Sequence, residues 1–177
     1  ENMDEYRVRC IFDKIDRNKT IRVKVPGSKS ITNRALLIAA LAEGETILKG
    51  ALFSNDAKNM LACLNALGIK MEIDEENETI TVQGCGGRLP VREASVNVGS
   101  AGTAARFLTA LLAFSAGVYH LDASEQMKKR PMKPLLDALI KLGALISYDE
   151  AEGHFPFTID SRAIKGGEIS LDTGISS

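Results

Sequence analysis

Basic and hydroxyl side chains cluster near the start of the chain, in the stretch Val25-Pro26-Gly27-Ser28-Lys29-Ser30-Ile31-Thr32-Asn33-Arg34. Alternating apolar residues precede it and an Ala- and Leu-rich segment follows, so it joins an expected strand over residues 21–25 to an expected helix over residues 34–42. The free N–H groups and the positive dipole end of such a helix favour an anion. Lys29 adds a mobile charge and the hydroxyl groups add donors, so anion binding is the expected chemistry.

Arg34 lies near the first helical turn in this interpretation, where the dipole disfavours a cation, which suggests that it has an anionic partner. The alternative is an ordinary Ser or Thr helix cap with a solvated Lys29 and Arg34. The stretch is not a P-loop, because the Gly-x4-Gly-Lys-[Ser/Thr] spacing is absent.

The same residues resemble a known family signature. Pro26-Gly27-Ser28-Lys29-Ser30, followed by Asn33-Arg34-Ala35, resembles the N-terminal motif of 5-enolpyruvylshikimate-3-phosphate synthase, or 3-phosphoshikimate 1-carboxyvinyltransferase. The resemblance covers essentially the whole chain, but only the first part of that family's chain. It implies a cytoplasmic transferase of the shikimate pathway to the aromatic amino acids, in the family that glyphosate targets. The implied reaction moves the enolpyruvyl group of phosphoenolpyruvate to the 5-hydroxyl of shikimate 3-phosphate and releases phosphate.

The resemblance also implies roles for single residues. Lys29 is expected to contact both substrates, while Ser30 and Arg34 hold shikimate 3-phosphate. Ser176 and Ser177 resemble the serine pair of the family's Ser-Ser-Gln motif and are expected to cap the phosphate of that substrate.

A second turn, residues 99–103, resembles the family's Asn-Ala-Gly-Thr-Ala motif, in which a backbone glycine lies beside phosphoenolpyruvate. Gly102 is that glycine and Thr103 follows it. Ser100 replaces the asparagine of the pattern and has a shorter reach, so its contact with ligand is left open. Phe107 stands where the pattern has proline. Taken alone, the turn has a structural alternative, a close helix–strand contact that requires glycine.

The run Lys128-Lys129-Arg130-Pro131 is the other charged cluster, and its ordinary interpretation is a solvated loop before a helix. The resemblance singles out Arg130, because the arginine of the family's Arg-Pro-[Ile/Met] motif binds the carboxylate or phosphate of phosphoenolpyruvate. Arginine suits this role because its planar fork pairs with two oxygens at once. Lys128 and Lys129 are expected to be surface charges.

Two similar halves are expected to position these residues. Residues 62–69 and 136–144 share an apolar pattern that ends in glycine, at an offset of about 75 residues. The expected units have the order strand–helix–strand–helix–strand–strand and cover residues 21–90 and 91–163, and residues 164–177 begin a third unit. Residues 1–20 are expected to form a strand segment that belongs with a missing C-terminal domain, which makes residues 21–177 an incomplete N-terminal domain.

The expected fold class is α/β, and the resemblance implies the α+β prism type with helices inside and sheets outside. In this arrangement the three turns at residues 27–30, 99–103 and 174–177 are equivalent. Units packed about a pseudo-threefold axis would bring three helix N-termini to one anion site.

The 177 residues have a net charge of −1, which gives no electrostatic case for nucleic acid or an anionic membrane as partner. No apolar run approaches the roughly 18 residues of a membrane span, and the N-terminus lacks a signal-peptide core. The three cysteines are scattered and odd in number, which is typical of reduced thiols in a cytoplasmic protein: Cys10, Cys63 and Cys85.

His120 and His154 have no Cys or carboxylate at ligand spacing, so both are interpreted as structural, and neither a metal nor a cofactor is expected. Asp56 is interpreted as a helix cap that also orients Lys29. The acid and base that the transfer needs are expected after Ser177, so the chain alone is expected to be inactive.

Two other functions stay open. The first is UDP-N-acetylglucosamine enolpyruvyl transferase, which resembles this architecture but carries a cysteine in the loop that matches residues 124–130, where this chain has none. The second is a non-enzymatic anion-binding or assembly domain.

Overall fold

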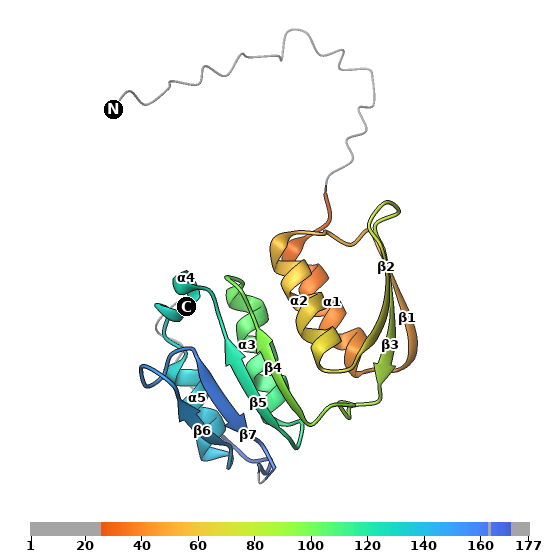
Figure 1. Ribbon diagram of the computed structural model, residues 1–177. Coiled ribbons are helices and arrows are strands. Elements are labelled where there is room, and N and C mark those ends of the chain that lie inside the picture. Colours follow the sequence, from red (N-terminus) through yellow and green to blue (C-terminus); the bar gives the residue numbers. More distant parts are fainter. Residues whose placement is uncertain (1–25, 163, 171–177) are drawn as a thin grey trace, which may run out of the picture.

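The computed structural model describes residues 26–162 and 164–170 (Figure 1). The expected strand at 21–25, together with Cys10, Ser176 and Ser177, lies outside the described residues. The helices and strands follow one another in this order: α1 (Lys29–Leu41), β1 (Glu43–Lys49), α2 (Asn55–Ala66), β2 (Lys70–Asp74), β3 (Thr79–Cys85), β4 (Glu93–Asn97), α3 (Gly102–Ala113), β5 (Val118–Asp122), α4 (Glu125–Lys128), α5 (Lys133–Lys141), β6 (Leu145–Tyr148) and β7 (Phe157–Asp160).

The strands form two sheets, and three strands of the second sheet have the same order as the three strands of the first. The first sheet has the order β1-β3-β2 and the second has the order β4-β5-β7-β6. All neighbours are antiparallel except β4 and β5, which run parallel. Strands β5-β7-β6 of the second sheet repeat the order β1-β3-β2 of the first. In each set a helix connects the two strands that come first along the chain: α2 lies between β1 and β2, and α5 lies between β5 and β6. This order confirms the expected repeat, while the residue limits of the units stay a prediction.

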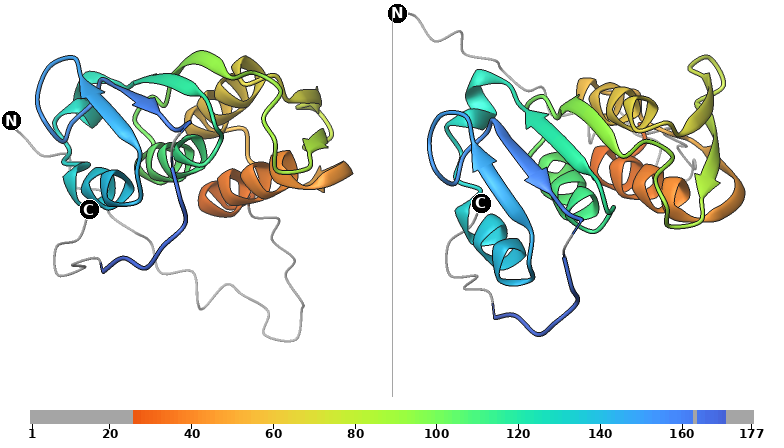
Figure 2. Two further views of the ribbon diagram at one scale, coloured as in Figure 1. Left: turned by 90° about the horizontal axis from the view of Figure 1, so that it is seen from below. Right: turned by 60° about the horizontal axis from the view of Figure 1, so that its bottom comes forward.

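The helices lie inside and the sheets outside, as expected. Helices α1 and α2 run along the inner face of the first sheet, and α3 and α5 cover one face of the second (Figures 1 and 2). Alternation along β3, β5 and β7 explains this layering, because buried apolar residues recur at every second position of these strands. In the second sheet Tyr119 pairs with Ile159 and Leu121 pairs with Phe157, and all four side chains are fully buried.

Small residues let the helices approach closely at the centre. Helix α1 contacts both α2 and α3. Four alanines of α1 and α3 are among the buried residues of the core: Ala39, Ala40, Ala104 and Ala105. The two halves therefore share one core, in which helices of the first half lie against helices of the second.

Serine caps decide where the first two helices begin. The Oγ atom of Ser28 accepts a hydrogen bond from the backbone N–H of Ile31, so α1 begins at Lys29 and not at Arg34 as expected. The Oγ atom of Ser54 caps α2 in the same way. The expectation that Asp56 is a cap was wrong, because Asp56 lies inside the first turn of α2.

Two further expectations are corrected. The predicted glycine loop 84–87 begins later, because Gly84 and Cys85 belong to β3. A Cβ atom at Gly84 would collide with the carbonyl oxygen of Ala42, so this strand position requires glycine. Before α5, the predicted loop contains the short helix α4, which is capped by Ser124. No helix within residues 26–162 and 164–170 has the length and apolar character needed to span a membrane.

Candidate functional site

Two loops that follow parallel strands lie side by side at one end of the molecule. Because β4 and β5 are parallel neighbours, the loop before α3 and the loop before α4 leave the sheet at the same edge. The backbone N–H of Ser124 donates to the carbonyl oxygen of Gly99 at 3.1 Å. The hydroxyl oxygens of Ser100 and Ser124 are 2.9 Å apart and share a hydrogen bond. The side chain of Ser100 therefore joins the two loops.

Two guanidinium groups surround the first residue of α3. A Cβ atom built on Gly102 would lie 2.8 Å from Nη1 of Arg130 and 3.3 Å from Nη1 of Arg106. Arg106 is one helical turn further along α3, and its Nη1 donates to the carbonyl oxygen of Gly102 at 3.1 Å. Its Nη2 lies 3.5 Å from the carbonyl oxygen of Pro131. The structure thus brings the predicted residues Gly102 and Arg130 together.

Arg106 was missed as a site residue by the sequence interpretation. The signal available was its spacing of four from Gly102, which places both on one face of a helix. Burial lowers the pKa of Arg106, and the neighbouring charge of Arg130 lowers it further. A partly buried cation beside a second cation favours an anion between them.

This pair of arginines has no acidic partner in the described chain. No carboxylate of residues 26–162 and 164–170 lies within ion-pair distance of Arg106 or Arg130. Nor does any side chain of the described residues cap the start of α3, which leaves its first N–H groups open. The arrangement can bind an anion through two charged forks and a helix start.

Lys128 behaves differently from Arg130, although only one residue separates them. Its Nζ lies 3.1 Å from Glu125, 3.5 Å from Asp122 and 3.8 Å from Glu150. The hydrogen bond with Glu125 raises the pKa of Lys128. Lys128 therefore links β5, α4 and the loop after β6, and it is not a free surface charge as expected.

The predicted residues of α1 lie on its first two turns. Lys29 forms an ion pair with Asp56 at 2.8 Å, so the expectation that Asp56 orients Lys29 was right. The carbonyl oxygen of Ser30 accepts a hydrogen bond of 3.5 Å from Arg34. Arg34 lies in the second turn of α1, beyond the strongest part of the dipole. Its Cζ is 5.5 Å from the ring centroid of Phe107 on α3.

Two of the three expected helix starts therefore belong to one end of the molecule. Arg34 and Phe107 connect the beginning of α1 to the beginning of α3, and Thr103 lies in the first turn of α3 beside Gly102. The third turn, with Ser176 and Ser177, lies outside the described residues, so convergence of three stays a prediction.

Comparison with known proteins gives the family. The family model of EPSP synthase (3-phosphoshikimate 1-carboxyvinyltransferase) matches residues 15–177. The chain belongs to the EPSP synthase family.

Members of the EPSP synthase family resemble the chain in sequence and in structure. The 3-phosphoshikimate 1-carboxyvinyltransferase of Nostoc punctiforme is 41% identical over 157 residues, which are 89% of this chain and 37% of the relative. The enzyme of that name from Opitutus terrae is 46% identical over 88% of this chain and 36% of its own. The EPSP synthase structure from Acinetobacter baumannii superposes with a TM-score of 0.78 and 29% identity, over 88% of this chain and 35% of that one. The chain thus spans little more than a third of the relatives that it matches.

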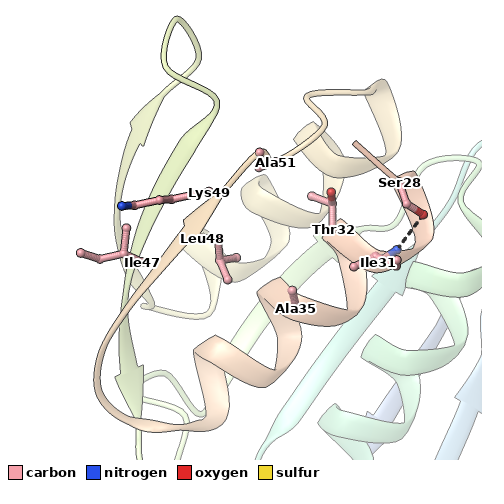
Figure 3. A pocket seen from close by; sticks show the side chains of 9 residues that line it. Ser28, Ile31, Thr32, Ala35, Ile47, Leu48, Lys49 and Ala51 are labelled. Carbon is pink, nitrogen blue, oxygen red and sulfur yellow. Dashed lines mark hydrogen bonds between the residues drawn. The ribbon is translucent and has the colours of Figure 1, made fainter. Parts of the chain in front are cut away.

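A groove of about 200 Å³ lies between α1 and β1 of this EPSP synthase family member, and neither Arg106 nor Arg130 lines it (Figure 3). Its lining is largely apolar and does not include Lys29, Ser30 or Arg34: Ser28, Ile31, Thr32, Ala35, Ile47, Leu48, Lys49, Gly50 and Ala51. It contributes no charged fork to an anion, so it is not the site that the basic residues form.

The histidines and cysteines of this EPSP synthase family member do not form a metal cluster in the described part of the chain. Nε2 of His120 lies 2.8 Å from Oδ2 of Asp149, a carboxylate partner that sequence spacing did not reveal. Cys63 and Cys85 are free thiols. The Sγ of Cys63 donates to the carbonyl oxygen of Asn97, and burial raises the pKa of this thiol to about 11.

Proposed function

We propose that the chain forms part of the substrate cleft of a 3-phosphoshikimate 1-carboxyvinyltransferase. The reaction joins the 5-hydroxyl oxygen of shikimate 3-phosphate to C2 of phosphoenolpyruvate; the hydroxyl group loses its proton and the methylene carbon gains one. Elimination then breaks the bond from C2 to the phosphate oxygen, and the methyl group loses a proton. Both substrates are multiply charged anions, so the cleft needs cationic groups.

The observation that carries the proposal is the arginine pair at Gly102. Arg106 and Arg130 stand at the open start of α3 with no carboxylate of the described residues beside them. Burying like charges in this way costs free energy unless an anion enters. Phosphoenolpyruvate has a carboxylate and a phosphate, and each matches the bidentate geometry of a guanidinium.

We assign the following roles. Gly102 and Arg130 hold phosphoenolpyruvate, helped by Ser100 and Thr103. The residues of α1 hold shikimate 3-phosphate, with Lys29 contacting both substrates: Lys29, Ser30 and Arg34. Ser176 and Ser177 cap the phosphate of shikimate 3-phosphate. The shared hydrogen bond between Ser100 and Ser124 supports a smaller role for Ser100, because its hydroxyl has a protein partner in the absence of ligand.

The proposal places the acid and base of the reaction outside residues 1–177, in a C-terminal domain that acts as partner. The carboxylate of Asp56 is occupied by Lys29. The proposed location is the cytoplasm, in keeping with the free thiols of Cys63 and Cys85. The family match favours this activity over transfer to UDP-N-acetylglucosamine. A non-enzymatic anion-binding domain is the alternative that experiment must separate.

The test of the site compares Arg130→Ala with Lys129→Ala, its exposed neighbour. A chimaera joins residues 1–177 to the remainder of the Nostoc punctiforme relative, and calorimetry measures its affinity for each substrate. Arg130→Ala is expected to weaken phosphoenolpyruvate binding about tenfold to more than a hundredfold, the value of a charge-assisted hydrogen bond. Lys129→Ala is expected to change neither affinity by more than about twofold, as for an exposed charge. Equal losses for both substrates in Arg130→Ala would reject the assignment of Arg130.

The test of the activity measures phosphate release with both substrates present. Residues 1–177 alone are expected to give no turnover, because each missing acid or base forfeits roughly 10²–10⁴-fold in rate. The chimaera is expected to turn over. A chimaera that binds both substrates but never reacts would favour the non-enzymatic alternative. Turnover by residues 1–177 alone would show that the catalytic groups lie within this chain.

A further inference from the structure

The guanidinium group of Arg34 lies over an aromatic ring from another helix. Its Cζ is 5.5 Å from the ring centroid of Phe107, within the roughly 6 Å at which a cation is attracted to a ring face. Arg34 comes from the second turn of α1, and Phe107 comes from the second turn of α3. The contact therefore joins α1, which carries Lys29 and Arg34, to α3, which carries Arg106.

An aromatic face holds a cation without neutralising it. Arg34 has no carboxylate within ion-pair distance in residues 26–162 and 164–170. Its hydrogen bond to the carbonyl oxygen of Ser30 is long, at 3.5 Å. The ring fixes the plane of the guanidinium while its N–H groups stay available to an anion. A carboxylate in the same place would have to be displaced before the anion could bind.

The ring of Phe107 does not serve the core. Phe107 is half-buried, and it belongs neither to the buried hydrophobic cluster nor to the apolar residues packed against that cluster. The ring is therefore not one of the side chains that form the buried core. Its defined contact is with Arg34, so its effect is expected in the site and not in the stability of the fold.

We propose that Phe107 is a positioning residue that orders Arg34 before shikimate 3-phosphate arrives. The identity of that ligand rests on the function proposed above. A free arginine side chain loses much rotamer freedom when it binds, and prior ordering by the ring removes part of this cost. The structure thus assigns a role to the phenylalanine that replaces the proline of the family pattern.

The first arm of the test needs no ligand. In residues 1–177, NMR measures the side-chain proton resonances of Arg34, which a ring beneath the guanidinium shifts upfield. We expect the shift in the unchanged chain and in Phe107→Tyr, and its loss in Phe107→Leu. Phe114→Leu is the matched control, since Phe114 ends the same helix and is exposed. Absence of the shift from the unchanged chain would overturn the proposal.

The second arm measures the affinity of the chimaera for each substrate. Phe107→Leu is expected to weaken shikimate 3-phosphate binding by about two- to fivefold, within the cost of immobilising one long side chain on binding. Phe107→Tyr is expected to bind shikimate 3-phosphate as the unchanged chimaera does, and phosphoenolpyruvate affinity should not change in either variant. Arg34→Gln removes the cation and is expected to lose affinity for shikimate 3-phosphate, and in that background Phe107→Leu should cause no further loss.

The outcomes separate the two proposals. An unchanged affinity for shikimate 3-phosphate in Phe107→Leu, with the ring-current shift lost, would overturn the positioning role and leave the proposed function intact. If the chimaera binds no shikimate 3-phosphate while the shift persists, the proposed function fails for Arg34. In that case the Arg34–Phe107 contact is supported by the ligand-free measurement, and its role in binding is rejected.

Discussion

Gly102 and Arg130 are so close that a single methyl group on the glycine would meet the arginine. The Cβ atom would lie 2.8 Å from Nη1 of Arg130, and its other near neighbour would be the guanidinium of Arg106. Both neighbours are ends of flexible side chains, and Gly102 does not have the positive φ that makes a side chain strained. The collision can therefore be relieved, but only by moving the groups that we assign to anion binding.

Gly102→Ala is accordingly expected to change binding without harming the fold. Displacing one charge-assisted contact should cost phosphoenolpyruvate affinity about tenfold or more, while shikimate 3-phosphate affinity stays within about twofold. The melting temperature should not fall, because alanine is favoured over glycine in a helix. Calorimetry on the chimaera measures the two substrate affinities, and thermal unfolding measures the melting temperature. Gly166→Ala is the control, since a Cβ atom there has no neighbour within 4 Å. A fall in stability without a fall in affinity would contradict the argument.

Arg106→Gln should reduce the response of the chain to anions. The variant removes one of two adjacent cations, so repulsion with Arg130 disappears and the anion-free chain is expected to be at least as stable. Inorganic phosphate should raise the melting temperature of the unchanged chain more than chloride does at equal ionic strength, since ligands that bind the folded state stabilise it. The increment should shrink in Arg106→Gln. An equal increment in both proteins would show that Arg106 takes no part.

Gly117→Ala should destabilise the fold, unlike Gly102→Ala. A Cβ atom at Gly117 would collide with the carbonyl oxygen of Arg92 and lie 2.5 Å from the hydroxyl oxygen of Tyr119. The backbone cannot yield, because Ser161 hydrogen-bonds both the N–H and the carbonyl oxygen of Gly117. We expect a loss of about 1–3 kcal/mol, as for overpacking of a core. Urea unfolding measures it, and a loss below about 0.5 kcal/mol, the range of a surface substitution, would contradict the stated geometry.

The thiol of Cys63 should make stability fall at high pH. Its pKa rises from 9.0 in the unfolded chain to about 11 in the folded chain, because it is buried. Between these values the unfolded chain has released a proton that the folded chain keeps, so rising pH favours unfolding. The contribution of this thiol to the free energy of unfolding is complete below pH 9 and is lost towards pH 11. It amounts to about 2–3 kcal/mol for two pKa units.

The effect of Cys63 is isolated by comparing the free energy of urea unfolding of the unchanged chain with that of Cys63→Ala, from pH 8 to pH 11. Tyr119 and Tyr148 also have raised pKa values through burial, so both proteins should lose stability with pH. Only the unchanged chain should show the additional loss from the thiol. Parallel curves for the two proteins would mean that Cys63 is already accessible to solvent in the folded state.

Much of the fold could be predicted from local patterns. The end of α2 before Gly68 and the repeat of strands and helices follow from short-range chemistry. The start of α1 was misplaced because the sequence does not say which of several serines caps a helix. The structure places the hydroxyl oxygen of Ser28 within reach of the N–H of Ile31.

The site was predicted in part, for a physical reason. Motifs identified Gly102 and Arg130, which are 28 positions apart, but not the arginine that completes the pair. The environment of Arg106 and the contact of Arg34 with Phe107 depend on how helices meet in space. Two cations of the same cluster also differ in their ion pairs. Lys128 lies near three carboxylates, whereas no carboxylate of the described residues pairs with Arg130. Composition cannot reveal which cations are already paired.

Each sheet closes within one continuous stretch of chain, residues 43–85 for the first and residues 93–160 for the second. Within the described residues no strand of one sheet pairs with a strand of the other, and the halves meet where α1 contacts α3 and where α2 contacts β4. Packed helices can slide past one another by small shear movements without breaking a strand ladder. Arg34 and Phe107 lie on opposite sides of that boundary. Any sliding of α1 along α3 would therefore change the distance between the basic residues of α1 and those beside α3. The distance between the two groups of cations thus depends on how the two halves pack against each other.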